Sequence, residues 1–157
     1  MTDNSSYCTP EFFMEQALLQ AKQAAKREEV PIGAVLVDNL TGNILSIAGN
    51  ETIERHDPTA HAEILCIRRA CSAAHSQRIP NTTLYVTLEP CTMCAAAIAF
   101  ARIEKIVIGA IDAKGGGVLH GAKFFDQPTC HHKIETQHGL MAEHSSALLK
   151  EFFKKRR

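Results

Sequence analysis

The sequence predicts an α/β fold in which one sheet carries helices on both of its faces. Two observations lead to this class. Apolar residues recur with helical spacing in four segments, while five shorter segments are rich in aliphatic and β-branched residues. The order along the chain is a helix, two strands, and then strands that alternate with helices. Because 157 residues with a hydrophobic fraction of 45% are enough for one core, we expect a single domain over residues 1–157.

The first element is a helix that ends before Pro31. Thr9 can cap its amino terminus, and Pro10 and Glu11 are a proline and an acid of the kind that first helical turns favour. Apolar residues then recur at helical spacing as far as Ala25.

Two strands with a turn between them follow this helix. Residues 33–37 and 44–48 are rich in aliphatic and β-branched side chains, and the linker 38–43 contains Gly42 among other turn-forming residues. We therefore predict a β-hairpin, in which the two strands are antiparallel.

Strands and helices alternate in the rest of the chain. The predicted strands are residues 83–88, 105–111 and 134–137, and the predicted helices are residues 60–74, 91–101 and 141–153. We expect parallel pairing wherever a helix lies between two strands, so the whole sheet is mixed. The glycine run 115–117 is too short for a linker and is typical of a mobile loop.

The charge balance excludes the class of strongly basic nucleic-acid-binding domains. Seventeen basic and seventeen acidic residues cancel, so any contact with nucleic acid has to be local. The local candidate is the segment 150–157, which joins Phe152 and Phe153 to several lysines and arginines. The alternative for this segment is a solvated helix end.

The chain shows no sign of a membrane or export signal. Residues 1–7 are polar and lack a basic export-signal segment, and the longest apolar run, 93–101, is far shorter than the ~20 residues of a bilayer crossing. Six cysteines are present, but a chain with a proper core does not need disulfides, and two of the cysteines form a C-x-x-C pair. We therefore expect reduced thiols and a cytoplasmic protein.

The sharpest chemical signal is Pro90-Cys91-Thr92-Met93-Cys94, at the junction of a predicted strand and helix. Cysteines at i and i+3 share one face of the first helical turn, where unpaired N–H groups favour thiolates. That arrangement suits a soft divalent metal, and redox chemistry is the alternative for an isolated C-x-x-C.

His61-Ala62-Glu63 supplies the rest of a metal site. Residues i and i+2 do not share a helix face, so both can address one site only if His61 lies where the chain enters the helix. Alone, this pair is more typical of a protein surface. Together with the two cysteines it matches the signature of zinc deaminases, in which the glutamate is not a metal ligand.

Three protein ligands, His61, Cys91 and Cys94, leave one tetrahedral position open, as in catalytic zinc sites. Zinc lowers the pKa of the water it binds to about 7, and Glu63 can accept and return the proton. We assign Cys66 and Cys71 to the core. The segment 130–132 is either a second metal cluster or a loop that lines the site.

Longer segments around these motifs resemble the bacterial tRNA-specific adenosine deaminases, a branch of the cytidine deaminase-like superfamily. The metal motif alone would identify only the superfamily. The uninterrupted run 56–63 and the terminal Phe152-Phe153 with its basic neighbours point to the tRNA branch. The matching segments are residues 29–35, 49–50, 56–63, 84–91, 112–114 and 148–153.

The resemblance implies a three-layer α/β/α fold with a central mixed five-stranded sheet, a homodimer with one Zn²⁺ per subunit, and conversion of the wobble adenosine of a tRNA anticodon loop to inosine. By position, Asn50 would hydrogen-bond the purine or its ribose, Asp112 would lie beside the sugar, and His132 would line the pocket. From the residues alone, Asn50 is a turn residue and Asp112 a strand-end cap. The other implied substrate contacts are Ala62, Phe152 and Phe153.

Two segments depart from the family's pattern in the loop expected to touch RNA. Residues 116–121 replace a small-residue and Ser-Leu stretch, and His131-His132 replaces the Asn-His pair of many members. These changes bear on the RNA contacts and leave the hydrolytic chemistry unaffected.

Two other functions are compatible with the motifs. A deaminase of a free base or nucleoside, such as guanine, cytosine or cytidine, uses the same metal and glutamate, but it has no need of a basic, aromatic carboxyl-terminal helix. A noncatalytic zinc-binding partner subunit is expected to lack the glutamate, whereas Glu63 is present. We expect the alanine-rich segment 94–101 to lie near a homodimer interface, because small side chains allow helices to approach closely.

Overall fold

Five strands form one mixed sheet at the centre of the protein, seen in a computed structural model that describes residues 8–156. The strands are β1 (Gly33–Asp38), β2 (Ile44–Gly49), β3 (Thr82–Leu88), β4 (Lys105–Ala110) and β5 (Glu135–His138), in the spatial order β2-β1-β3-β4-β5. β1 is antiparallel to both β2 and β3, while β3, β4 and β5 run parallel. The predicted hairpin and the predicted mixed sheet are both confirmed.

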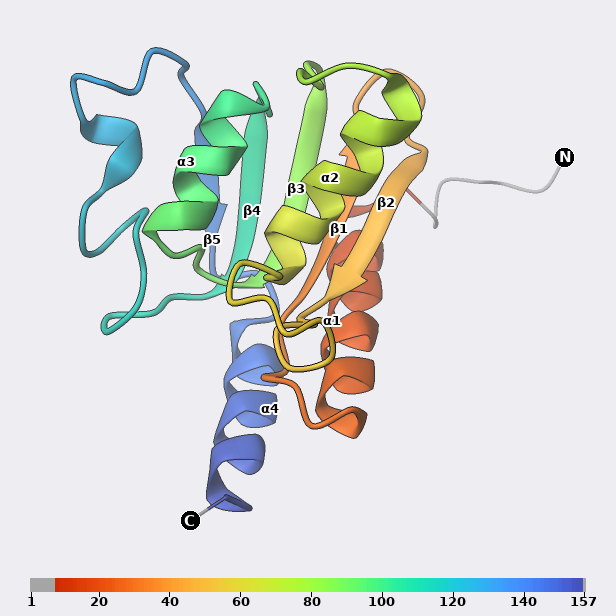
Figure 1. The fold of residues 1–157 in the computed structure, drawn as a ribbon, viewed down its shortest axis with the longest axis vertical. Helices are drawn as coiled ribbons and strands as arrows, with labels where there is room; N and C mark the ends of the chain where they lie inside the picture. Colours follow the sequence, from red (N-terminus) through yellow and green to blue (C-terminus); the bar gives the residue numbers. More distant parts are fainter. Residues whose placement is uncertain (1–7, 157) are drawn as a thin grey trace, which may run out of the picture.

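Two helices cover each face of the sheet, so the predicted three-layer α/β/α architecture is confirmed (Figure 1). The helices α1 (Pro10–Lys26) and α4 (Ala142–Lys154) lie on one face, and α2 (Ala62–Ala74) and α3 (Thr92–Phe100) lie on the other. The crossover from β4 to β5 is the exception among the parallel connections. It is a long loop with one short 3₁₀ helix, η2 (Phe124–Asp126).

The start of α1 shows how individual residues determine where a helix begins and how closely it packs on the sheet. The Thr9 side chain accepts a hydrogen bond from Phe12 N–H at 3.1 Å, and Pro10 occupies the first helical position, as predicted. Gly33 opens β1 directly beneath this helix, and a Cβ there would overlap the Ala17 carbonyl. Glycine therefore lets α1 lie close against the sheet.

The alternation of side chains along the strands divides the core between the two faces. On β1 and β3, Leu36 and Leu84 face α2 and α3, whereas Val35 and Tyr85 face α1 and α4. Residues of β4 alternate in the same way. Each face of the sheet is therefore buried by its own pair of helices.

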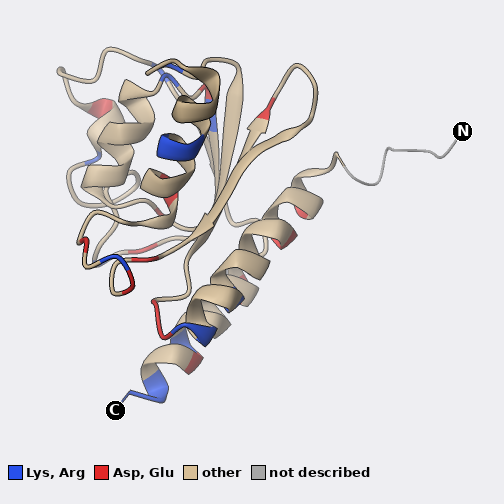
Figure 2. Cartoon of the chain, turned by 45° about the vertical axis from the view of Figure 1, so that its right-hand side comes forward, with Lys and Arg blue, Asp and Glu red and all other residues tan. Residues whose placement is uncertain are grey.

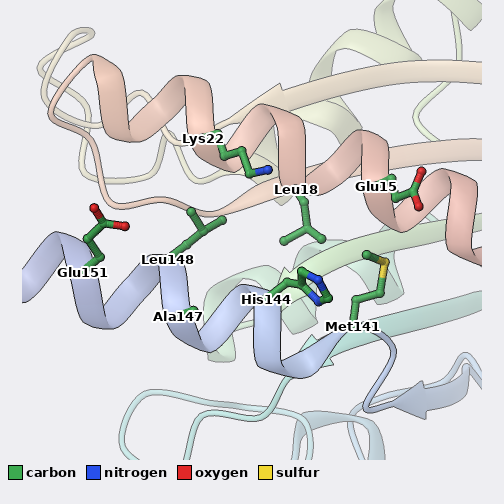
Figure 3. A pocket seen from close by; sticks show the side chains of 8 residues that line it. All are labelled: Glu15, Leu18, Lys22, Met141, His144, Ala147, Leu148 and Glu151. Atoms are coloured by element: carbon green, nitrogen blue, oxygen red, sulfur yellow. The ribbon is translucent and has the colours of Figure 1, made fainter.

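The layer formed by α1 and α4 retains a cavity of about 300 Å³. Side chains of the two helices approach it from opposite sides, with Leu18 and Leu148 at its apolar centre (Figure 3).

No helix within residues 8–156 has the length and hydrophobicity that crossing a membrane requires.

Several predicted boundaries shift by one or two residues. The helix predicted from residue 60 begins at Ala62, because Asp57 forms a turn of its own in which its Oδ1 accepts the Thr59 N–H at 2.8 Å. The final helix begins at Ala142, after Met141 in the left-handed conformation (φ 54°). The predictions made for residues 1–7 and for Arg157 concern positions outside the described residues.

Candidate metal centre

Two helix starts meet beyond the carboxyl end of β3 and bring three metal-binding side chains together. His61 is the N-cap residue of α2 and Cys91 the N-cap residue of α3, and both have extended backbone and make no capping hydrogen bond with their side chains. Cys94 lies in the first turn of α3. His61 Nδ1 is 3.6 Å from Cys91 Sγ and 3.5 Å from Cys94 Sγ. His61 therefore lies where the chain enters its helix, as the sequence predicted.

These donors fit a tetrahedral zinc ion. Zn–N bonds of about 2.05 Å and Zn–S bonds of about 2.3 Å at a tetrahedral angle separate nitrogen from sulfur by roughly 3.6 Å. The nitrogen–sulfur separations match this value, and all three donor atoms lie within 4.8 Å of one another. Within residues 8–156 this is the one group of three or more His, Cys, Asp or Glu side chains with metal-binding geometry.

The two thiols share a hydrogen bond. The hydrogen bond from Cys94, with a further one from His61, lowers the pKa of Cys91 to about 4. The same hydrogen bond and the burial of Cys94 raise the pKa of Cys94, while the bond to Cys91 raises the pKa of His61. The shared hydrogen bond therefore favours a thiolate on one of the two cysteines, and metal binding would displace the remaining protons.

Glu63 lies in the first turn of α2, beside the donors but outside their set. The residue is only 4% exposed, and burial raises the pKa of its carboxyl group. A carboxyl group with a raised pKa next to a metal site can take up and release a proton near neutral pH.

Asn50 supports the start of α2. Its Oδ1 accepts the Ala62 N–H at 2.9 Å, between His61 and Glu63, and Arg27 donates to its carbonyl oxygen at 3.2 Å. The amide oxygen of Asn50 is thus engaged within the protein. Ala62 packs its side chain into the core, and its N–H donates to Asn50.

Two predicted substrate residues meet at a second cavity, of about 590 Å³. Asp112 and Phe153 both line it, together with Ile32, which accepts the Asn50 N–H at 3.1 Å, and Lys114. The cavity thus lies next to the segment that leads into the metal site. Phe153 is 48% exposed there.

Phe152 lies on the other side of α4 and is only 7% exposed. The Arg156 guanidinium stacks over its ring at 3.5 Å from the centroid, and this arginine also donates to the carbonyls of Phe152 and Glu28. The two neighbouring phenylalanines therefore have different surroundings, and only Phe153 faces the cavity.

The structure does not bring His132 to this site. Its Nε2 bonds the Ile103 carbonyl at 2.8 Å, just before β4 begins. Because β3 and β4 are parallel, that end of the sheet is opposite to the end that carries Cys91. Cys130 donates to the His132 carbonyl and joins no metal-binding group within the described chain. Cys66 and Cys71 pack in the core, as predicted.

Two buried carboxylates near the site were not predicted from the sequence. Glu29 accepts the N–H groups of Ile53 and Glu54, both at 2.9 Å, and Glu89 accepts hydrogen bonds from the loop after β4. Glu89 bonds Asp112 and residues 118–120, and although burial acts to raise its pKa, these hydrogen bonds lower it overall. For Glu89 the available signal was a charged residue directly after an apolar strand, and this signal does not name its partners.

Two glycines of the run predicted as a mobile loop are packed inside the protein. Gly116 and Gly117 are buried, and Gly117 N–H bonds the Pro90 carbonyl at 2.8 Å. A Cβ on Gly116 would overlap the Glu89 carboxylate, and one on Gly117 would overlap the backbone of Thr92. These glycines allow the loop to pack tightly on the start of α3.

The family model and the related sequences that match this chain both identify deaminases. The family described as the cytidine and deoxycytidylate deaminase zinc-binding region matches residues 8–110. A tRNA-specific adenosine deaminase of Agrobacterium fabrum is 54% identical over 145 residues, which cover 92% of this chain and 94% of that protein.

Solved structures agree with this result. A structure from a study of A-to-I editing by tRNA:A34 deaminases has a TM-score of 0.85 and 55% identity, over 87% of this chain and 98% of its own. A guanine deaminase of Nitrosomonas europaea has a TM-score of 0.80 at 20% identity, over 92% and 84% of the two chains, and shows the shared fold alone. The chain therefore belongs to the zinc-binding cytidine and deoxycytidylate deaminase family and, within it, to the tRNA-specific adenosine deaminases.

Proposed function

We propose that this protein hydrolyses the wobble adenosine of a tRNA anticodon loop to inosine and releases ammonia. The observation that carries the proposal is the combination at one site of three metal donors and a buried carboxyl group, Glu63, that is not among them. Three donors leave a fourth tetrahedral position open. The donor set His61, Cys91 and Cys94 would hold one Zn²⁺ per subunit.

Zinc, when bound, supplies Lewis-acid activation that makes water nucleophilic near neutral pH. Glu63 then moves the protons. Its carboxylate takes a proton from the attacking water and delivers it to the ring nitrogen next to the reacting carbon. It then takes the remaining proton from the hydroxyl group added to that carbon and gives it to the amine, which departs as ammonia. Asn50 holds the start of α2 through Ala62 and so orients both His61 and Glu63.

The cavity lined by Asp112 and Phe153 supports an RNA substrate. Lys114 and Lys150 line this cavity with Phe153, and Lys154 joins the same three residues around an adjoining hollow. None of the three lysines forms an ion pair with an acid of residues 8–156. Unpaired positive charges beside an exposed aromatic ring suit phosphates next to an unstacked base. Basic residues gather at the carboxyl end of α4 (Figure 2). An anticodon loop offers an unpaired base that can enter a deep pocket.

A deaminase of a free base or nucleoside is the second candidate. The fold shared with a guanine deaminase supports it, because the same scaffold can surround a small substrate. An unpaired cluster of lysines is not needed for such a substrate.

The homodimer and the cytoplasmic location are further parts of the proposal. The outer side of α3 exposes 36% of Met93 and 68% of Phe100, beside small alanines that would allow a second subunit to approach. All six cysteines are free thiols, which suits a reducing compartment that also contains tRNA. Sedimentation of the protein as a monomer at working concentration would contradict the dimer.

Incubation of the zinc-loaded protein with adenosine-bearing tRNA, adenosine, cytidine and guanine tests the substrate. Inosine and ammonia should form from the tRNA at a much higher kcat/KM than product forms from any small substrate. A preference for guanine or cytidine over tRNA would replace the proposal with the second candidate.

A further inference from the structure

The Glu89 carboxylate is the most heavily hydrogen-bonded acid beside the metal site. It directly precedes Pro90-Cys91, and its side chain is fully buried. Oε1 accepts the Asp112 N–H at 3.0 Å and contacts His120 Nδ1 at 2.8 Å. Oε2 lies within 3.3 Å of three consecutive N–H groups, those of residues 118–120.

All five of these contacts come from one segment, residues 112–120. This segment follows β4 and, within the described chain, contains no helix or strand that could hold its shape. Three successive N–H groups around one oxygen form a concave anion site, and here the chain fills that site with its own carboxylate. Glu89 is therefore the main anchor of the segment.

The same segment touches both the metal ligands and the substrate cavity. Gly117 bonds the Pro90 carbonyl and packs on the backbone of Cys91 and Thr92 so closely that a Cβ would not fit. At its other end, Asp112 lines the cavity that contains Phe153. A shift of the segment would thus move the wall of the cavity relative to the Cys91 backbone.

We propose that Glu89 is a positioning residue, which holds the 112–120 segment against the start of α3 and so sets the distance between the metal ligands and Asp112. The proposal rests on the proposed function only for the identity of the substrate. Glu89 touches neither metal donor atoms nor the reacting base. Its effect passes through Asp112 and through the backbone that carries Cys91.

Glu89→Gln is the test variant, because it keeps the size and removes the charge. If the amide oxygen accepts the three N–H groups of residues 118–120, its NH₂ group must face the Asp112 N–H, so that hydrogen bond is lost. Glu29→Gln is the matched control. Glu29 is also buried (1% exposed, against 3% for Glu89) and also binds loop N–H groups, but those belong to residues 53 and 54 on the other side of the site.

Four measurements on the zinc- or cobalt-loaded protein test the proposal. In Glu89→Gln, amide hydrogen exchange should accelerate in residues 112–120 and the cobalt absorption bands should shift, while the metal content stays at one per chain. The kcat/KM for tRNA should fall by about 10- to 100-fold. In Glu29→Gln, exchange should accelerate around residues 53 and 54 instead, and the cobalt bands should match those of the wild type.

Gly116→Ala is a second way to release the 112–120 segment from the Glu89 carboxylate. The added Cβ would push the carboxylate away from the segment, while Glu89 itself stays unchanged. If either variant loosens the segment but keeps wild-type cobalt bands and a kcat/KM within about twofold, Glu89 is not a positioning residue. Failure of the wild type to deaminate tRNA would overturn the proposed function instead. The exchange and cobalt measurements would still decide the role of Glu89.

Discussion

The metal site and the face of α4 lie at the same end of the sheet but are built in opposite ways. The metal site consists of buried or half-buried side chains at two helix starts, and Asn50 braces one of them. The α4 face consists of exposed lysines and Phe153 around a cavity, and its lysines make no ion pair with a described acid. The difference indicates that the deamination step depends on the few metal-site residues, which the packed core holds in place. Under the proposed function, substrate choice would depend on side chains that the fold does not require.

The largest effect should follow removal of a metal ligand. Cys91→Ala leaves two protein donors, too few for the tetrahedral site, so zinc content and turnover should both fall close to zero. Metal analysis of the purified variant, with circular dichroism as a check of folding, measures this. Full zinc content would show that Cys91 is not a ligand and that the buried side chains here do not form the metal site.

Glu63→Ala should separate the metal from proton transfer. Because Glu63 lies outside the donor set, zinc content should stay near one per chain, while kcat falls by about 10²- to 10⁴-fold. Stopped assays of inosine formation under saturating tRNA provide the rate. A variant that lost its zinc would instead identify Glu63 as a ligand.

Neutralising the lysines around Phe153 should change binding more than chemistry. In a Lys114→Gln, Lys150→Gln, Lys154→Gln variant, tRNA affinity should fall, and the slope of log affinity against log salt should flatten by about one for each phosphate that is no longer neutralised. Lys155→Gln is the control, because Lys155 already pairs with Glu151 at 3.2 Å. An unchanged salt slope in the triple variant would mean that this surface is only a solvated helix end.

The smallest effect on function is expected from Phe153→Ala. Loss of a ring that stacks on a base should weaken tRNA binding by about 1–3 kcal/mol without lowering the melting temperature. Phe152→Ala should do the reverse, because Phe152 is buried, and truncation of a buried phenylalanine costs about 3–5 kcal/mol of stability. Thermal melts and binding assays on both variants test this pair, and a large stability loss in Phe153→Ala would contradict the assignment.

Local sequence patterns were enough to predict the elements and the core of the metal site. The spacing of the two cysteines and the position of His61 before a helix depend on short-range geometry, which a sequence displays directly. The position of His132 could not be predicted, because it depends on the path of a long loop without periodicity. Glu29 and Glu89 bind backbone N–H groups of distant loops, and such partners leave no mark on residue types. The gathering of Lys114 with α4 likewise depends on packing between segments far apart in the chain.

His61 and Cys91 occupy N-cap positions without capping their helices. A capping side chain typically contributes about 1 kcal/mol. α3 begins without that support from its N-cap residue, and α2 receives it from the distant Asn50 instead. Metal binding would join the two helix starts, and this links the folding equilibrium to the concentration of free zinc. The amount of folded protein in a cell would then follow the supply of zinc, whether or not tRNA is present.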